Sequence, residues 1–217
     1  MGSPNNIVWI LIAYLIGSIP SAYLITKRVR GIDIREHGSG NVGATNVFRV
    51  VGKSWGSVVL LSDFCKGWLV TALLAPAANA FPELAPAVKQ LIFGFAAVAG
   101  HTWSPWLKLK GGKGVAVSAG SLAGIFPFAT ALATIIWGIC FLIKRYVSLA
   151  SVVAVGTYPI LLLLFHRDAD SFGIVFVISL ALAALLIYNH RSNLDRLKRG
   201  EEPQVSFGPK KDSSPSS

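Results

Sequence analysis

Charged residues are scarce in this sequence of 217 residues, and cysteine is scarcer still. Asp, Glu, Lys and Arg make up only 14% of the chain, whereas hydrophobic residues make up 53% and the mean hydropathy is +0.59. Soluble domains carry about 25% charged residues, so this composition excludes an ordinary soluble domain. The two cysteines, Cys65 and Cys140, lie in apolar runs and are interpreted as small buried residues, which excludes a disulfide framework.

No carboxylate cluster or Cys/His set has the spacing of a metal site, so we expect no metal and no cofactor. What the chain has instead is a series of apolar runs of about 18 residues or more, long enough to cross a bilayer as helices. The runs are continuous rather than alternating, which excludes a transmembrane β-barrel. We therefore predict an all-α polytopic membrane protein with seven transmembrane helices. The predicted spans are 5–27, 54–75, 84–101, 113–127, 128–146, 148–165 and 172–190.

The ends of the chain carry two further predictions. The first apolar run has no basic segment before it and no clear cleavage site, so we expect a retained anchor rather than a signal peptide. Residues 1–200 are predicted to form a single membrane domain. Residues 201–217 are polar and rich in Pro and Ser, and we expect a disordered tail there.

Most of the 20 Lys and Arg residues fall on one side of the predicted spans. The positive-inside rule places that side in the cytoplasm, with the N-terminus outside and the C-terminus inside. The net charge of +10 therefore faces the cytoplasmic leaflet of the lipid bilayer and an anionic ligand, and we expect no nucleic-acid partner. The basic residues of this side lie in the segments 27–53, 108–113, 144–145 and 191–211.

The segment 38–49, GSGNVGATNVFR, is small and polar, and it falls in a predicted cytoplasmic loop. Glycine lets backbone N–H groups approach a ligand closely. Asn, Ser and Thr add hydrogen-bond donors, and Arg offers a two-pronged donor suited to phosphate. The segment is therefore predicted to be an anion-binding loop. Its candidate residues are Ser39, Gly40, Asn41, Gly43, Thr45, Asn46 and Arg49.

A second segment of the same character, KGGKGVA over residues 110–116, precedes a predicted helix on the same side. A helix N-terminus presents unpaired N–H groups and a positive dipole end, both of which favour phosphate. A flexible basic turn would explain this segment equally well by itself, but the neighbouring anion-binding loop favours phosphate. The candidate residues are Gly111, Gly112, Lys113 and Gly114.

Asp63 and Lys66 share one face of a predicted span, because they lie three residues apart on a helix. A charge at the centre of a membrane costs about 2.5–3.5 kcal/mol on insertion scales, so such residues usually have a purpose. Three interpretations stay open. The pair could serve substrate binding, or it could be a mutually neutralised pair that holds helices together. Alternatively, Asp63 could brace Arg49 or Lys113.

His101 and His190 end two of the predicted spans. Either could act as a general base, or could simply be an interfacial residue whose ring bonds backbone carbonyls. His190 is the stronger candidate, because Asn193 lies three residues later and would face the same way. Ser148 begins another span, where its hydroxyl could reach the site or could cap the helix.

Taken together, three of these segments resemble the PlsY family, bacterial membrane glycerol-3-phosphate acyltransferases that use acyl phosphate as donor. The resemblance rests on SGNVGATN at 39–46, GGKGVA at 111–116 and the His190-x-x-Asn193 pair. It implies seven transmembrane helices in the bacterial inner membrane, with the active site facing the cytoplasm. It also implies transfer of an acyl group from acyl phosphate to the 1-hydroxyl of sn-glycerol 3-phosphate. The products would be lysophosphatidic acid and phosphate, and the enzyme supplying the donor would make acyl phosphate from acyl carrier protein.

The resemblance also assigns roles to individual residues. It ties Ser39 and Arg49 to activity, the glycine-rich second segment to glycerol 3-phosphate, and Glu202 to structural integrity. Ser192 departs from the pattern, since relatives often carry an acidic residue there. The predicted catalytic residues are Ser39, Asn41, Arg49, His190 and Asn193. The predicted substrate-binding residues are Gly40, Gly43, Thr45, Asn46, Lys66, His101, Gly111, Gly112, Lys113, Gly114 and Ser148.

An activated donor makes direct attack by the glycerol hydroxyl sufficient, with no covalent intermediate. The base could be His190 or the substrate's own phosphate, and the sequence does not separate these. A transporter of a phosphorylated solute would place helix N-termini similarly, but it predicts internal repeats, which are not found. A scaffold protein leaves the two anion-binding segments unexplained. An acyl-CoA or acyl carrier protein donor predicts a His-x4-Asp motif, which occurs only formally at His190 and Asp195.

Overall fold

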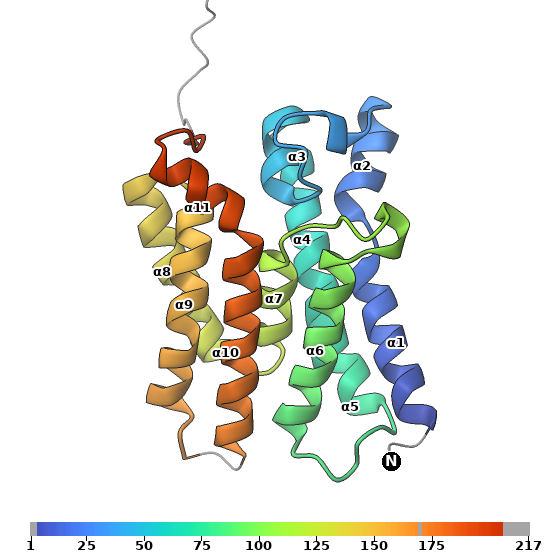
Figure 1. Ribbon diagram of the computed structural model, residues 1–217. Coiled ribbons are helices and arrows are strands. Elements are labelled where there is room, and N and C mark those ends of the chain that lie inside the picture. Colours follow the sequence, from blue (N-terminus) through green and yellow to red (C-terminus); the bar gives the residue numbers. More distant parts are fainter. Residues whose placement is uncertain (1–3, 169–170, 206–217) are drawn as a thin grey trace, which may run out of the picture.

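The computed structural model describes residues 4–168 and 171–205, and it builds this part of the chain from helices and connecting turns (Figure 1). No strand occurs in either range, which confirms the predicted all-α class. The α-helices are α1 Pro4–Ser18, α2 Ser21–Arg30, α3 Ala44–Val50, α4 Lys53–Leu69, α5 Ala75–Ala77, α6 Pro86–Thr102, α7 Val115–Ala123, α8 Pro127–Lys144, α9 Val147–Phe165, α10 Phe172–Asn189 and α11 Arg191–Lys198. Between them lie the 3-10 helices η1 Ile34–Glu36 and η3 Pro105–Leu107 and the π-helical turn η2 Val70–Leu74.

The predicted first span, residues 5–27, is two helices rather than one. Only Ile19 and Pro20 separate α1 from α2. Proline has no N–H with which to continue a helix, and it keeps the preceding residue out of the helical conformation. The break therefore releases backbone carbonyl groups at the end of α1, and these take partners from elsewhere in the protein.

Five helical segments of the described ranges are long and apolar enough to cross a membrane: Asn5–Arg30, Lys53–Ala77, Pro127–Lys144, Val147–Phe165 and Phe172–Asn189. The other two predicted spans correspond to α6, with 17 residues, and α7, with 9. Nine helical residues rise about 14 Å, roughly half the hydrocarbon thickness, so the predicted span 113–127 was too long. Gly114 has φ +86°, which keeps the chain non-helical before α7. The count of seven transmembrane helices stays a prediction.

Glycines let two helix pairs approach closely, α1 with α6 and α4 with α7. A Cβ at Gly17 would lie 2.0 Å from the carbonyl oxygen of Ala97, and one at Gly67 would lie 2.1 Å from that of Val117. Small residues are typical of helix contacts in membranes, where close backbone packing stabilises association. These contacts fix α6 and α7, the two helices that flank the second predicted anion-binding segment.

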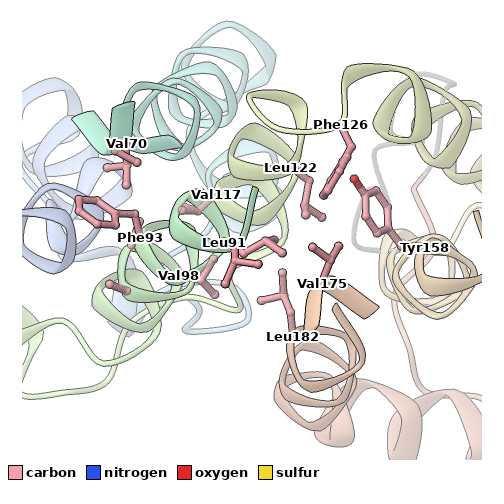
Figure 2. Packing of buried hydrophobic residues seen from close by; sticks show 14 of the residues in the cluster. Val70, Leu91, Phe93, Val98, Val117, Leu122, Phe126, Tyr158, Val175 and Leu182 are labelled. Carbon is pink, nitrogen blue, oxygen red and sulfur yellow. The ribbon is translucent and has the colours of Figure 1, made fainter. Parts of the chain in front are cut away.

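The largest buried core is centred on α7 (Figure 2). Val117 and Leu122 of this helix pack in one cluster with Phe93 of α6 and Leu182 of α10. Figure 1 shows α8, α9 and α10 on one side of α7 and α1, α4 and α6 on the other. The short helix therefore packs between the two groups of long helices, which also meet directly where α6 contacts α10.

The outer surface of the bundle is strongly apolar. Ile143 and Leu164, for example, are 69% and 65% exposed. Such a surface is unfavourable in water and suits the hydrocarbon of a membrane. Cys65 and Cys140 carry free thiols, and both lie half-buried rather than buried as the sequence indicated.

The polar segments gather at one end of the bundle, the end at which Figure 1 shows α2, α3 and α11. A small apolar cluster beneath α3 anchors this end, and it includes the buried side chains of Ile34, Val42, Val47 and Leu107. These residues come from η1, the first polar segment, α3 and η3. The sequence-predicted anion-binding segments are thereby brought to the same end of the molecule.

Candidate active site

The first polar segment is only partly a loop. It was predicted as a loop over 38–49, but residues from Ala44 onward form α3, so Asn46 and Arg49 project from a helix. Gly43 is the residue before this helix and has an extended conformation. Ser39 and Gly40 are exposed, while Thr45 is half-buried.

Asn46 holds the loop in shape. Its side chain is 1% exposed. Its Nδ2 donates to the carbonyl oxygens of Ile34 (3.3 Å), His37 (2.9 Å) and Asn41 (3.0 Å), and its Oδ1 accepts from the N–H of Ser39 at 2.9 Å. The amide is therefore fully used inside the protein. These bonds hold the backbone around Ser39 and Asn41, and substrate binding by Asn46 stays a prediction.

The second polar segment packs against the end of α6. The N–H of Gly111 donates to the carbonyl of Thr102 at 2.9 Å, and that of Gly112 donates to the carbonyl of His101 at 3.0 Å. These two N–H groups are therefore unavailable to a phosphate, contrary to the simplest form of the prediction. The first intrahelical bond of α7 is donated by Ser118, so the N–H groups of residues 115–117 have no helical partner.

Lys113 leads into that helix and reaches the corner between α10 and α11. Its Nζ donates to Oδ1 of Asn193. Asn193 in turn donates from Nδ2 to Oε1 of Glu202 at 2.7 Å, and Ser148 Oγ donates to the same oxygen at 2.7 Å. Arg196 Nε donates to Oε2 of Glu202 at 2.9 Å. One buried carboxylate thus links α9, α11 and the segment before α7.

The charges of this site favour an anion. Burial lowers the pKa of Lys113 to about 8; Glu202 opposes this shift, while the positive charges of Arg196 and Arg49 add to it. Burial raises the pKa of Glu202, but hydrogen bonds from Asn193 and Ser148 and the charge of Arg196 outweigh it and hold the pKa below its usual range. Three cations therefore surround one carboxylate, which leaves net positive charge for a phosphate.

His190 faces this cluster as a neutral ring. Its Nδ1 lies 2.8 Å from the carbonyl oxygen of Leu186, and because a carbonyl only accepts, Nδ1 carries the proton. Burial lowers the pKa of His190 to about 4; the bond to Leu186 opposes the shift, and the charge of Lys113 adds to it. The lone pair of the neutral ring is on Nε2, which can accept a hydrogen bond from a hydroxyl.

Arg49 joins the first segment to the C-terminal part of the chain. Its Nη2 donates to the carbonyl of Pro203 at 3.3 Å. The N–H of Val205 donates to the carbonyl of Arg145 at 2.9 Å, and Glu202 is 7% exposed. Residues 201–205 therefore pack on the helices, whereas the rest of the predicted tail, 206–217, lies outside the described residues.

Two predicted substrate-binding residues lie below the site rather than in it. Lys66 and His101 are 5% and 9% exposed and contact each other. Within the described ranges, Ser148 joins the site through its hydrogen bond to Glu202.

Sequence reasoning missed two side chains. Arg196 was identifiable, because it follows Asn193 by three residues on α11 and so faces the same way. Asn189, whose Nδ2 donates to the carbonyl of Lys113 at 3.3 Å, gave no comparable signal.

Comparison with known proteins places this arrangement in a family. The sequence profile of the glycerol-3-phosphate acyltransferases matches residues 7–200. A glycerol-3-phosphate acyltransferase of Desulforudis audaxviator is 43% identical over 196 residues, covering 90% of this chain and 93% of the relative. One from Bacillus velezensis is 40% identical over 198 residues, covering 91% of this chain and 96% of the relative.

Two crystal structures of PlsY (YgiH), described as an integral membrane glycerol 3-phosphate acyltransferase, have the same fold. The glycerol 3-phosphate form superposes with a TM-score of 0.82 at 34% identity, covering 93% of this chain and 96% of that one. The lysophosphatidic acid form superposes with a TM-score of 0.80 at 35% identity, covering 93% of this chain and 95% of that one. The chain therefore belongs to the glycerol-3-phosphate acyltransferase family of integral membrane proteins, as its PlsY-like motifs predicted.

Proposed function

We propose that this protein transfers a fatty acyl group from acyl phosphate to the 1-hydroxyl of sn-glycerol 3-phosphate. The products are 1-acylglycerol 3-phosphate (lysophosphatidic acid) and inorganic phosphate. The observation that carries the proposal is the group of three cations, Lys113, Arg49 and Arg196, around the single carboxylate of Glu202. Both substrates carry a phosphate, and this cluster supplies more positive charge than Glu202 neutralises.

Two parts of the site suit the two phosphates. Lys113 and the unpaired N–H groups at the start of α7 suit the phosphate of glycerol 3-phosphate. Arg49 and the exposed turn at Ser39 and Gly40 suit the phosphate of the donor, because Arg offers a fork of donors and Gly40 has φ +70°, a conformation that favours glycine.

The geometry favours direct attack. The Nδ1 of His190 bonds a backbone carbonyl rather than a carboxylate, so the ring lacks the partner of a Ser-His-Asp arrangement. The glycerol hydroxyl oxygen would attack the acyl carbonyl carbon, a new C–O bond would form, and the bond from that carbon to the phosphate oxygen would break. The electron pair leaves with the phosphate. Donors near Ser39 and Asn41 would stabilise the developing oxyanion.

The proton of the attacking hydroxyl needs an acceptor. A ring with a pKa of about 4 is a weak base, whereas a phosphate monoester has its second pKa near about 6. The substrate phosphate is therefore the better proton acceptor. In this mechanism Nε2 of His190 accepts a hydrogen bond and orients the hydroxyl.

The proposal includes a placement in the cell. With seven spans, the N-terminus lies outside, the C-terminus lies in the cytoplasm, and the site faces the cytoplasm at the bacterial inner membrane. The support is the basic character of the end that carries α2, α3 and α11.

The catalytic membrane domain spans residues 1–200, with 201–217 as a tail whose first residues close the site. The acyl chain lies along the lipid-facing helix surface, and an enzyme that makes acyl phosphate from acyl carrier protein supplies the donor.

The test is a comparison of donors. Purified protein in lipid nanodiscs receives glycerol 3-phosphate with acyl phosphate, acyl-CoA or acyl carrier protein, and the acylated product is measured for each. We expect product with acyl phosphate alone and loss of product in Arg49→Ala. Equal or better use of acyl-CoA would refute the proposed donor, and uptake of glycerol 3-phosphate into sealed vesicles without acylation would refute the proposed reaction.

A further inference from the structure

Three buried polar side chains lie directly beneath the glycine-rich second segment. Asp63 and Lys66 come from α4 and His101 from the end of α6, and they are 2%, 5% and 9% exposed. Ionisable groups are expensive to bury in a membrane protein unless they are paired. The hydrogen-bond partners of these three side chains indicate which segments of the protein they support.

Lys66 is the centre of the group. Its Nζ donates to the carbonyl of Ile19 at 2.9 Å and lies 3.1 Å from Nδ1 of His101. It also forms an ion pair with Oδ1 of Asp63 at 2.8 Å, although that oxygen is outside hydrogen-bond geometry. Because an ammonium only donates, Nδ1 of His101 must accept, and the neutral ring carries its proton on Nε2.

His101 supports the glycine segment from below. Its carbonyl accepts from the N–H of Gly112, and a Cβ added at Gly112 would lie 2.2 Å from Nε2 of the ring. A Cβ at Gly111 would lie 1.9 Å from the His101 carbonyl oxygen. The segment therefore rests on this histidine, and the orientation of the ring decides where the segment lies.

The break between α1 and α2 provides the other anchor. Pro20 interrupts the helix, and the carbonyl of Ile19 accepts from the N–H of Ser21 at 3.0 Å and from Nζ of Lys66 at 2.9 Å. Ser104 Oγ donates to the carbonyl of Ser18 at 2.7 Å. The broken helix, α4 and the end of α6 thus meet around one lysine, and the turn after α6 bonds the neighbouring carbonyl of Ser18.

We propose that Asp63, Lys66 and His101 are positioning residues that set the glycine segment, and with it Lys113 and the start of α7, for the phosphate of glycerol 3-phosphate. This inference rests on the proposed function. It differs from the first two sequence interpretations, because Lys66 and His101 do not touch substrate and the Asp63–Lys66 pair does more than neutralise itself. It extends the third, because Asp63 pairs with Lys66 and acts on Lys113 only through His101 and the glycine segment. Asp63 forms an ion pair with Lys66, the Lys66 ammonium fixes the tautomer of His101, and His101 supports the glycine segment.

A double variant separates positioning from charge neutralisation. Asp63→Asn with Lys66→Met removes both charges together, so no unpaired charge is left in the protein. We expect a folded protein whose KM for glycerol 3-phosphate rises about tenfold or more, while kcat and the KM for the acyl donor change little. The control is Lys89→Met, which removes a different helix lysine. Lys89 is half-buried on α6, and its Nζ lies 2.7 Å from the carbonyl oxygen of Ala78.

A second variant decides the matter if the double variant does not fold. His101→Phe keeps a ring under Gly112 but removes the nitrogen that accepts from Lys66, and Lys66 keeps its ion pair with Asp63. We expect the same selective rise in KM. A wild-type KM in either folded variant, or an equal loss toward both substrates, overturns the positioning role.

The two proposals fail in distinguishable ways. Binding of glycerol 3-phosphate to the purified protein is measured by calorimetry without any donor. If the wild-type protein binds glycerol 3-phosphate but transfers no acyl group, the proposed reaction fails, and weaker binding in His101→Phe still supports positioning. If acyl transfer is normal and His101→Phe binds as the wild type does, only the positioning role fails.

Discussion

Replacing Glu202 by Gln tests whether the charge balance around Lys113 controls substrate binding. Gln keeps the size of the side chain but removes the negative charge that opposes the lowering of the Lys113 pKa. It also weakens the bonds from Asn193, Ser148 and Arg196. A nearby opposite charge typically moves a pKa by about 1–3 units, so the pKa of Lys113 should fall from about 8 to near or below neutrality.

The sign of the pH effect follows from the charge of lysine. Lys113 binds phosphate when protonated, so affinity for glycerol 3-phosphate is full below its pKa and falls as the pH rises through it. In the wild-type protein that fall is expected near pH 8. In Glu202→Gln it should begin at least about one pH unit lower, which corresponds to about 1.4 kcal/mol of binding free energy in the pH range between the two pKa values. The substrate phosphate titrates near about pH 6 and stays dianionic across this range.

The assay is the KM for glycerol 3-phosphate between pH 6.5 and 9.5 at saturating donor (a range chosen to bracket a pKa of about 8). The matched control is Glu201→Gln, because Glu201 is the adjacent carboxylate but pairs with the exposed Arg199 at 2.8 Å. It should reproduce the wild-type profile. If Glu202→Gln also shows the wild-type profile, then the carboxylate does not set the charge state of Lys113 and the electrostatic reasoning is wrong.

Three further predictions concern single residues. Gly112→Ala should abolish use of glycerol 3-phosphate, because its Cβ would lie 2.2 Å from Nε2 of His101. The control Gly138→Ala should behave as the wild type, because a Cβ there would have no atom within 4 Å. Normal activity of Gly112→Ala would contradict the packing. His190→Gln should lower kcat by less than about tenfold, because its pKa of about 4 makes it a poor base; a general base would account for about 10²–10⁴ in steady-state kinetics. Arg49→Ala should reduce kcat/KM by about 10²–10³. The control is Arg30→Ala, which should change kcat/KM little, although the guanidinium of Arg30, like that of Arg49, bonds a backbone carbonyl. Equal effects of the two variants would contradict the proposed role of Arg49.

Much of the fold follows from the distribution of apolar residues. Long runs identify α4, α8, α9 and α10, because no other structure buries about 20 apolar residues in sequence in a membrane. Hydropathy gave no measure of how short α7 is. Its length is set by Gly114 and by the packing of Val117 and Leu122 against neighbouring helices, contacts that no local pattern encodes.

The segments that form the candidate site were predictable from the sequence, but the contacts that individual side chains make there were not. Composition identified both polar segments, and charge placed them on one side. Asn46 shows the limit, because its amide is consumed by backbone groups that only the folded loop brings near. Glu202 shows it as well, since the resemblance gave it a structural role, yet its contacts with Ser148 and Asn193 depend on how the segment after α11 turns back.

The most direct test of the central proposal is the stoichiometry and position of acyl transfer. Purified protein in nanodiscs is given acyl phosphate and glycerol 3-phosphate, released phosphate is counted, and the acylated product is identified by mass spectrometry. We predict one lysophosphatidic acid per phosphate released, acylated at the 1-hydroxyl. Phosphate release without acylated product, or no reaction of this donor, would contradict the account.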